Sequence, residues 1–158
     1  MKALVIYDSF FGNTEKVAQA VGTALGGAYE VSVVRVSDAS LDLLTGLDLL
    51  VLGSPTRGFS ASPLTKAFLK AVPAGGLKGV RVAAFDTRMD LKQVNNAFLT
   101  FMVKIFGYAA EPLAKGLVSK GGTLAAPAGG FIVTASEGPL KEGELERAAQ
   151  WAQAVAGS

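Results

Sequence analysis

The sequence predicts an α/β fold in which helices cover both faces of a doubly wound parallel sheet. Five apolar segments alternate along the chain with segments of helical periodicity, which is typical of repeated strand–helix–strand units. Four of the five are almost continuously apolar, as expected for strands covered on both faces. The 158 residues contain no internal repeat and no linker, so we expect a single domain over residues 1–158.

The five expected strands are of two kinds. The second, Val31–Val36, alternates apolar and polar residues, which favours an edge strand. The others are the near-continuous apolar runs Ala3–Tyr7, Leu49–Leu52, Val80–Phe85 and Phe131–Val133.

Helical patterns fill the segments between the strands. The first covers Thr14–Leu25 and should end at the glycine pair that follows. Ser62 is a favourable N-cap followed by Pro63 at the first helical position, so a second helix should start there. We expect further helices over Tyr108–Lys120 and from about Glu142, where early glutamates complement the helix dipole.

A short loop of small and hydroxyl residues joins the first strand to the first helix. It runs from Asp8 to Thr14 and includes Ser9, Gly12 and Asn13. Such a loop offers N–H groups and hydroxyls at a helix N-terminus, where the helix dipole favours an anion. It contains no Lys, so it is not the common nucleotide-binding loop. It predicts a phosphate site; an ordinary turn with a good N-cap is the alternative.

Two further loops should border the same site. Ligands of doubly wound sheets bind beyond the carboxyl ends of the strands, where the strand order reverses. Residues 54–60 follow the third strand, and residues 86–88 follow the fourth.

Composition excludes several kinds of chemistry. The chain has no Cys and no His, which excludes disulfides, thiolate nucleophiles, zinc and iron–sulfur sites and Ser-His-Asp catalysis. Redox chemistry would need an organic cofactor. The longest uncharged stretch, residues 121–136, contains Pro127 and is shorter than the ~20 apolar residues of a membrane span. Lys2 leads directly into a strand without room for a secretory signal, so we expect a soluble, cytoplasmic protein.

The net charge of +2 is unevenly distributed. Residues 54–104 contain eight basic and two acidic side chains, which could serve an acidic partner or a phosphate-bearing ligand. Lys66, Lys70 and Lys78 are more typical of solvated helix faces. Aromatic residues are not interleaved with the basic ones, so we expect no nucleic-acid partner.

With these loops placed, the chain resembles the flavodoxin family. The first loop of that family reads roughly Ser/Thr-x-Ser/Thr-Gly-Asn-Thr and holds the phosphate of FMN. Ser9, Gly12, Asn13 and Thr14 match it, and Phe11 replaces a hydroxyl residue.

The second family loop, Gly-Ser-Pro-Thr followed by an aromatic residue, is matched from Gly53 to Thr56. Arg57 stands where the ring-stacking aromatic is expected, and Phe59 lies two residues further on. Residues 86–88 also lack the aromatic that commonly covers the other face of the ring. The resemblance spans the whole chain, and the fifth strand lacks a long insertion, as in short-chain members.

The resemblance implies a five-stranded sheet of order 2-1-3-4-5, bound FMN, and one-electron transfer between redox partner proteins. It implies three groups of cofactor-binding residues, which are Ser9, Phe10, Phe11, Gly12, Asn13 and Thr14, then Pro55, Thr56, Arg57, Gly58 and Phe59, then Asp86, Thr87 and Arg88.

Two other functions stay open at this point. Without stacking aromatics, an open ring face could admit a substrate, as in an FMN-dependent oxidoreductase acting on quinones. A module that no longer binds flavin and acts through protein contacts is the other. In the flavin-binding cases, Arg57, Arg88 and Lys92 against Asp86 and Asp90 predict a less negative reduction potential than is usual for the family.

The segment Met89–Gly107 departs from the family pattern. Its apolar residues recur at helical spacing, for example at Leu91, Val94 and Phe98. It could be a core helix, a lid over the flavin, or a docking or dimer face. Its polar residues argue against membrane insertion.

Overall fold

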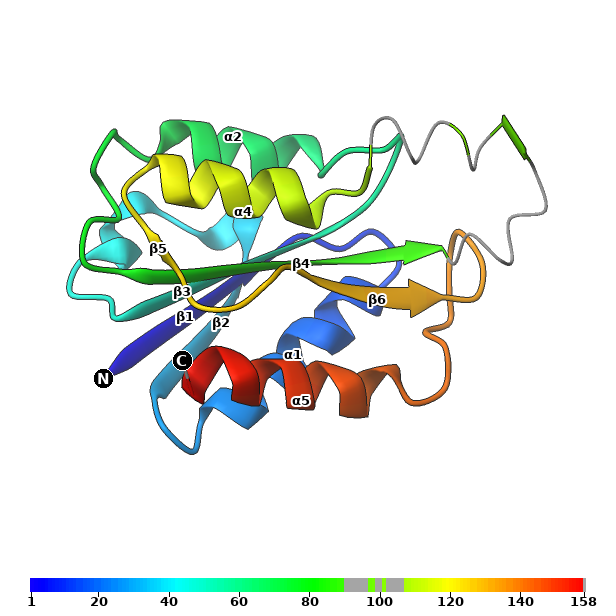
Figure 1. Cartoon of the computed structure of the whole chain (residues 1–158), viewed down its shortest axis with the longest axis horizontal. Helices are drawn as coiled ribbons and strands as arrows, with labels where there is room; N and C mark the ends of the chain where they lie inside the picture. The colour runs from blue at the N-terminus through cyan, green and yellow to red at the C-terminus, as the bar shows by residue number, and fades with distance from the viewer. Residues whose placement is uncertain (90–96, 99–100, 102–106, 158) are drawn as a thin grey trace.

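The computed structural model describes residues 1–89, 97–98, 101 and 107–157 (Figure 1). Its centre is a parallel sheet in the order β2-β1-β3-β4, with β5 and β6 both paired to β4. This confirms the predicted doubly wound sheet with strand order 2-1-3-4-5. The strands are β1 (Lys2–Tyr7), β2 (Glu30–Arg35), β3 (Leu49–Pro55), β4 (Arg81–Met89), β5 (Thr123–Leu124) and β6 (Gly129–Val133).

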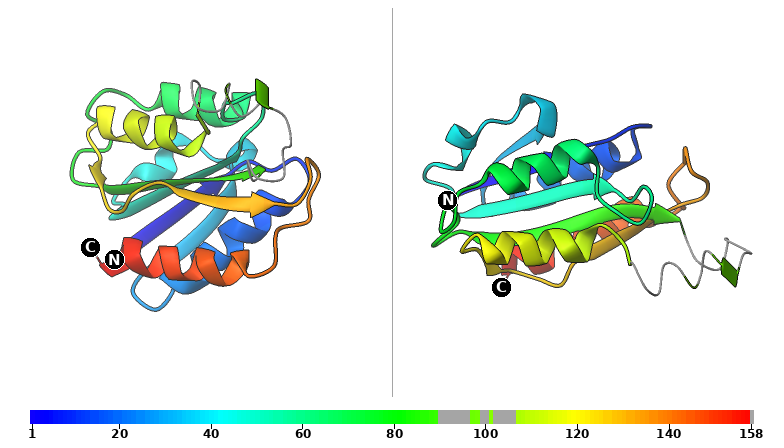
Figure 2. Two further views of the ribbon diagram at one scale, coloured as in Figure 1. Left: turned by 45° about the vertical axis from the view of Figure 1, so that its right-hand side comes forward. Right: turned by 90° about the horizontal axis from the view of Figure 1, so that it is seen from above.

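Helices cover both faces of the sheet, as Figures 1 and 2 show. On one face lie α1 (Asn13–Leu25) and α5 (Glu144–Gly157), and on the other α2 (Pro63–Ala71) and α4 (Ala110–Ser119). Two short 3₁₀ helices, η1 (Val36–Asp38) and η2 (Leu41–Leu44), follow β2. No helix among the described residues has both the length and the apolar character needed to cross a membrane.

A hydrophobic core lies on each face because successive residues of a strand point to opposite sides of the sheet. In β1, Val5 joins the core that contains Val17 of α1 and Ala148 of α5. The next residue, Ile6, joins the core that contains Leu113 of α4. The near-continuous apolar strands of the sequence therefore serve two cores at once.

The fourth strand is longer than predicted. It was expected to end at Phe85, with Asp86, Thr87 and Arg88 in a loop, but β4 continues to Met89. The register with β6 explains the extension, because Phe85 to Met89 pair with residues 129–133. The backbone of these polar residues is hydrogen-bonded within the sheet, and their side chains find partners of their own.

The fifth strand is divided into two pieces, although the sequence pattern predicts only one, Phe131–Val133. β5 pairs with the start of β4 and β6 with its end, with residues 125–128 between them. Pro127 in this stretch has no N–H for a sheet hydrogen bond. Its carbonyl accepts a hydrogen bond from Trp151 Nε1 of α5 at 2.9 Å. The expected strand Phe131–Val133 is thus the end of a longer, interrupted edge.

The predicted start of α2 is confirmed. Pro63 is its first residue, and Ser62 Oγ accepts a hydrogen bond from the Thr65 N–H at 3.3 Å. The helix expected over Tyr108–Lys120 is found as α4, Ala110–Ser119.

The last helix, α5, starts at Glu144, later than the expected Glu142. Gly143 has φ 88, a left-handed conformation that cannot belong to the helix. Glu144 then anchors the start of α5 to the sheet, because its carboxylate accepts the Ile132 N–H at 2.6 Å and Arg147 Nε at 2.9 Å.

The expectations for the segment Met89–Gly107, a core helix, a flavin lid or a docking or dimer face, fall mostly outside the described residues. Met89 ends β4.

Gly53→Ala should destabilise the fold. Gly53 of β3 lies beside Phe85 of β4, and a methyl group at residue 53 would overlap the Phe85 ring. Overpacking of this kind costs about 1–3 kcal/mol. Urea denaturation followed by circular dichroism measures the free energy of unfolding. Gly157→Ala is the matched control, because no atom in the described part of the chain lies within 4 Å of the added methyl. Equal stability of the two variants would contradict the packing argument.

Glu144→Gln should destabilise the fold at neutral pH but not in acid. Burial raises the pKa of Glu144, but the Arg147 guanidinium and the Ile132 N–H outweigh it and hold that pKa below its usual 4.5. The stabilisation is therefore present above the unfolded pKa and lost as the pH falls through the lower, folded one. We expect the free energy of unfolding of the variant to be about 1.5–3 kcal/mol lower than that of the wild type at pH 7. This difference should become smaller below pH 4.5. Glu146→Gln, at an exposed position of the same helix, serves as control. A stability difference between the wild type and Glu144→Gln that does not depend on pH would refute the role of the Glu144 carboxylate.

Candidate functional site

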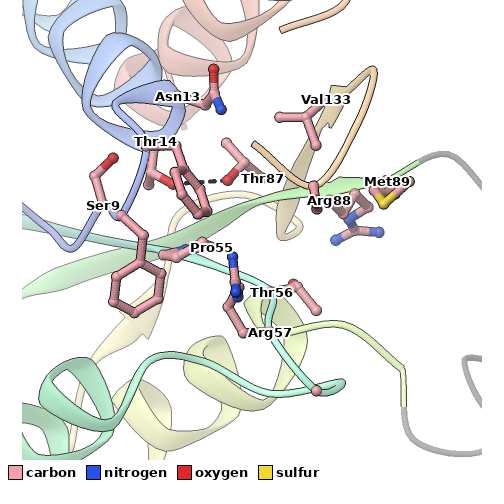
Figure 3. A pocket seen from close by; sticks show the side chains of 14 residues that line it. Ser9, Asn13, Thr14, Pro55, Thr56, Arg57, Thr87, Arg88, Met89 and Val133 are labelled. Atoms are coloured by element: carbon pink, nitrogen blue, oxygen red, sulfur yellow. Dashed lines mark hydrogen bonds between the residues drawn. The ribbon is translucent and has the colours of Figure 1, made fainter. Parts of the chain in front are cut away.

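The carboxyl ends of β1, β3 and β4 open into one pocket of about 270 Å³ (Figure 3). Its described walls come from the loops after β1 and β3, from the start of α1, from the ends of β3, β4 and β6, and from the loop after β6. The lining residues are Ser9, Phe10, Phe11, Asn13, Thr14, Pro55, Thr56, Arg57, Gly58, Thr87, Arg88, Met89, Val133 and Ser136.

The N-terminus of α1 faces this pocket without a side-chain cap. Its N-cap residue is Gly12, at φ 91 and with no side-chain hydrogen bond to the helix. The first intrahelical bond runs from the Lys16 N–H to the Gly12 carbonyl. Within the described part of the chain, five N–H groups of this loop and first turn have no protein acceptor, those of Phe10, Phe11, Asn13, Thr14 and Glu15. The alternative interpretation of this loop, an ordinary turn with a good N-cap, requires a side-chain hydrogen bond to the start of α1 that Gly12 does not make.

Hydrogen bonds fix the loop from behind. The Ser9 N–H donates to Asp8 Oδ1 at 2.9 Å, and the Gly12 N–H donates to Ser9 Oγ at 3.0 Å. From β2, Arg35 Nη1 donates to the Ser9 carbonyl at 2.8 Å and Arg35 Nη2 lies 3.2 Å from Glu15 Oε2. The loop carbonyl and nearby acids are thus turned toward Arg35, and the open N–H groups are held in a fixed arrangement.

The side chains of the first loop have different tasks. Thr14 Oγ1 and Thr87 Oγ1 lie 2.8 Å apart, so one hydroxyl donates to the other and one hydrogen remains for a ligand (Figure 3). Asn13 Nδ2 donates instead to the Glu137 carbonyl at 3.0 Å. Gly138 allows this contact, because a Cβ there would lie 2.5 Å from Asn13 Nδ2. Asn13 therefore fastens the loop after β6 to the start of α1.

The loop after β3 is a tight turn closed on itself. Arg57 and Ser60 exchange backbone hydrogen bonds at 2.9 and 3.1 Å. Gly58 and Phe59 at the tip have φ 54 and 65. Thr56 joins this turn to its neighbours, since its N–H donates to the Thr87 carbonyl at 2.9 Å and its hydroxyl accepts the Ala109 N–H at 3.0 Å.

An ion pair at the end of β4 joins the buried Asp86 to Arg88, which lines the pocket. Asp86 is fully buried, and its two oxygens accept Arg88 Nε at 2.6 Å and Arg88 Nη2 at 2.8 Å. The Ala110 N–H at the start of α4 donates to Asp86 Oδ2 at 2.9 Å. Burial raises the pKa of Asp86, and these bonds oppose that rise. On its other side, the Arg88 guanidinium stacks 3.8 Å from the centroid of Tyr108.

Positive charge dominates the pocket wall. No acidic side chain is among the described lining residues. Arg88 is neutralised by Asp86, whereas Arg57 has no carboxylate partner in the described part of the chain. The Arg57 guanidinium lies 5.5 Å from the ring centroid of Phe10 and 5.3 Å from that of Phe11. Both phenylalanines are about half exposed, at 50% and 48%.

Eleven of the fourteen predicted site residues line the pocket. The other three are not among its lining residues: Gly12 is the N-cap residue of α1, Asp86 is fully buried, and Phe59 lines the neighbouring groove between α2 and α4. The pocket is also lined by three residues that were not among the predicted ones, Met89, Val133 and Ser136. Val133 ends a strand that had been predicted, so the rule of carboxyl ends, applied to the fifth strand as well, could have found it.

A family model described as Flavodoxin matches residues 5–151 of this chain. The chain belongs to the flavodoxin family. As a flavodoxin, it is an FMN-binding electron carrier.

Solved flavodoxins cover nearly the whole chain. A flavodoxin from the domain Archaea is 21% identical with a TM-score of 0.76, over 99% of this chain and 97% of its own. Oxidised flavodoxin 1 from Bacillus cereus is 18% identical with a TM-score of 0.78, over 99% and 98%. Oxidised flavodoxin 2 from the same organism is 25% identical with a TM-score of 0.72, over 99% of both chains.

Proposed function

We propose that this flavodoxin holds the FMN phosphate on the loop Ser9–Thr14 and the flavin ring between the turn Pro55–Gly58 and Thr87-Arg88, and carries single electrons between redox partner proteins. The observation that carries the proposal is the uncapped N-terminus of α1, which shares one pocket with the ends of β3 and β4. Bound FMN supplies the one-electron chemistry, and the protein supplies binding and electrostatics.

The donors around the first loop fit a phosphate dianion. Its N–H groups combine with the positive end of the α1 dipole, an arrangement that binds phosphate without a metal or a lysine. The Thr14–Thr87 hydroxyl pair offers one more hydrogen, and Ser9 Oγ, which accepts the Gly12 N–H, keeps its own. No atom of the described residues lies within 4 Å of the position that a Cβ of Gly12 would take, so a ligand can approach the backbone there.

Arg57 fits the position of the ring-stacking aromatic. Its guanidinium is planar and can stack on a flat ring, as it does beside Phe10 and Phe11. Because Asp86 already compensates Arg88, Arg57 carries the excess positive charge of the pocket wall. This charge stabilises the negative charge that reduction adds to a flavin. It supports the expectation of a less negative potential than is usual for the family.

We also propose a cytoplasmic location, since that is the usual compartment of flavodoxins.

Thr14→Val should weaken FMN binding. The variant keeps the shape of the side chain but removes the hydroxyl paired with Thr87. A hydrogen bond to a charged group is worth about 1.5–3 kcal/mol, so the dissociation constant should rise roughly tenfold to a hundredfold. Fluorescence titration of the flavin-free protein with FMN measures it. Thr23→Val, at an exposed position of the same helix, should bind FMN as the wild type does. Unchanged affinity of the Thr14 variant would refute the phosphate site.

Arg57→Gln should make reduction of the bound flavin harder. An exposed charge interaction of about 0.5–1 kcal/mol corresponds to about 20–40 mV for one electron. The reduction potential for the second electron, which forms the hydroquinone, should become more negative by that amount. Potentiometric titration of the FMN-loaded protein measures the change. Lys115→Gln removes the same charge from an exposed position that does not line the pocket, and should leave the potential unchanged. Equal potentials in the two variants would rule out this role for Arg57.

A further inference from the structure

A second concavity is lined by residues of α2 and α4. These two helices lie on the face of the sheet opposite α1 and α5 (Figure 2). The concavity has a volume of about 410 Å³, and none of its described lining residues also lines the cofactor pocket. Its walls include Leu69 of α2 and Pro112 and Leu113 of α4. Gly116 lets the helices approach, because a Cβ there would lie 2.5 Å from Leu69 Cδ2. The result is a shallow, mainly apolar groove.

Three lysines line this groove, and none of its described lining residues is acidic. Lys66 and Lys70 are one helical turn apart on α2, so they lie on the same side of that helix. Lys66 Nζ donates to Ser60 Oγ at 3.1 Å, and Lys120 Nζ reaches the Lys70 carbonyl at 3.4 Å. These neutral acceptors leave the charges uncompensated, and none of the ion pairs in the described part of the chain uses a lysine.

The groove continues to the mouth of the cofactor pocket. Ser60, Ala61 and Lys66 line both the groove and a shallow depression beside it. The depression shares Phe10, Phe11, Arg57 and Gly58 with the cofactor pocket. A protein seated on the groove would therefore extend over Arg57, where the flavin is proposed to bind.

We propose that the α2–α4 groove is the docking site of an acidic redox partner, which sets an apolar side chain on the groove floor and carboxylates against Lys66, Lys70 and Lys120. Charge complementarity selects this partner, because a basic rim attracts carboxylates and repels a basic protein. Because the groove is continuous with the cofactor pocket, a partner docked on this face would lie close to the proposed flavin site, as electron transfer requires. The inference rests on the proposed carrier function.

The probe is a synthetic peptide with four Glu residues around a central Leu, titrated into isotope-labelled, FMN-loaded protein at low salt. Amide chemical shifts should change on α2, on α4 and in residues 59–61. A peptide with Lys in place of Glu, and one with Gly in place of the central Leu, should bind at least about fivefold more weakly. Binding should also weaken as the salt concentration rises.

Variants of the protein separate a site from general attraction to a basic protein. Lys66→Glu combined with Lys70→Glu should weaken binding of the Glu peptide by about tenfold or more. Lys2→Glu makes the same kind of change outside the groove lining and should have little effect. Each variant is checked for unchanged circular dichroism and FMN affinity, because none of these lysines lines the cofactor pocket.

Equal weakening by Lys2→Glu, shifts confined to another surface, or no binding up to roughly 1 mM would each overturn the docking site. Failure of the proposed function would have a different readout. The wild-type protein would not bind FMN, while the peptide added to the flavin-free protein would still change the amide chemical shifts of α2 and α4. Shifts on this face with the expected charge dependence support the proposal.

Discussion

The open N-terminus of α1 is the feature on which the site depends. A helix start normally finds capping groups in its own sequence, but here Gly12 provides none and the neighbouring side chains are engaged elsewhere. Asn13 holds the loop after β6, and Thr14 pairs with Thr87 of β4. The N–H groups left over can be satisfied only by water or by an anion. Contacts from Arg35 of β2, from Thr87 of β4 and from the loop after β6 thus hold an anion site in place before a ligand binds.

The charges around this pocket differ in kind. Arg88 is held in place by the buried Asp86 and by the ring of Tyr108. Asp86 also accepts the Ala110 N–H, so the pair helps to connect β4 to the start of α4. Arg57 lies on the surface against two phenylalanines and keeps its charge unpaired among the described residues. A formal count over the flanking loops would weigh the two arginines equally. The contacts distinguish them, because Arg88 is paired with Asp86 whereas Arg57 has no carboxylate partner among the described residues.

This distribution gives the carrier a basic face on one side. The lysines of the α2–α4 groove and Arg57 form a continuous strip that begins at the cofactor pocket. Lysines such as Lys66 and Lys70 are typical of solvated helix faces when considered one by one. Together with the apolar floor of the groove, they favour a docking surface instead, because a partner's apolar and acidic side chains can bind this combination.

The strand–helix alternation, the start of α2 and the two loops after β1 and β3 that line the pocket could be predicted from the sequence, because they follow from local periodicity, capping chemistry and the rule of carboxyl ends. It could not determine that β4 runs on through Asp86 to Met89, since that depends on pairing with β6, more than 40 residues later in the chain. Nor could it separate Asp86, buried under Arg88, from residues that line the pocket. Such distinctions belong to the tertiary structure, because burial and ion pairing are set by neighbours that are distant in sequence.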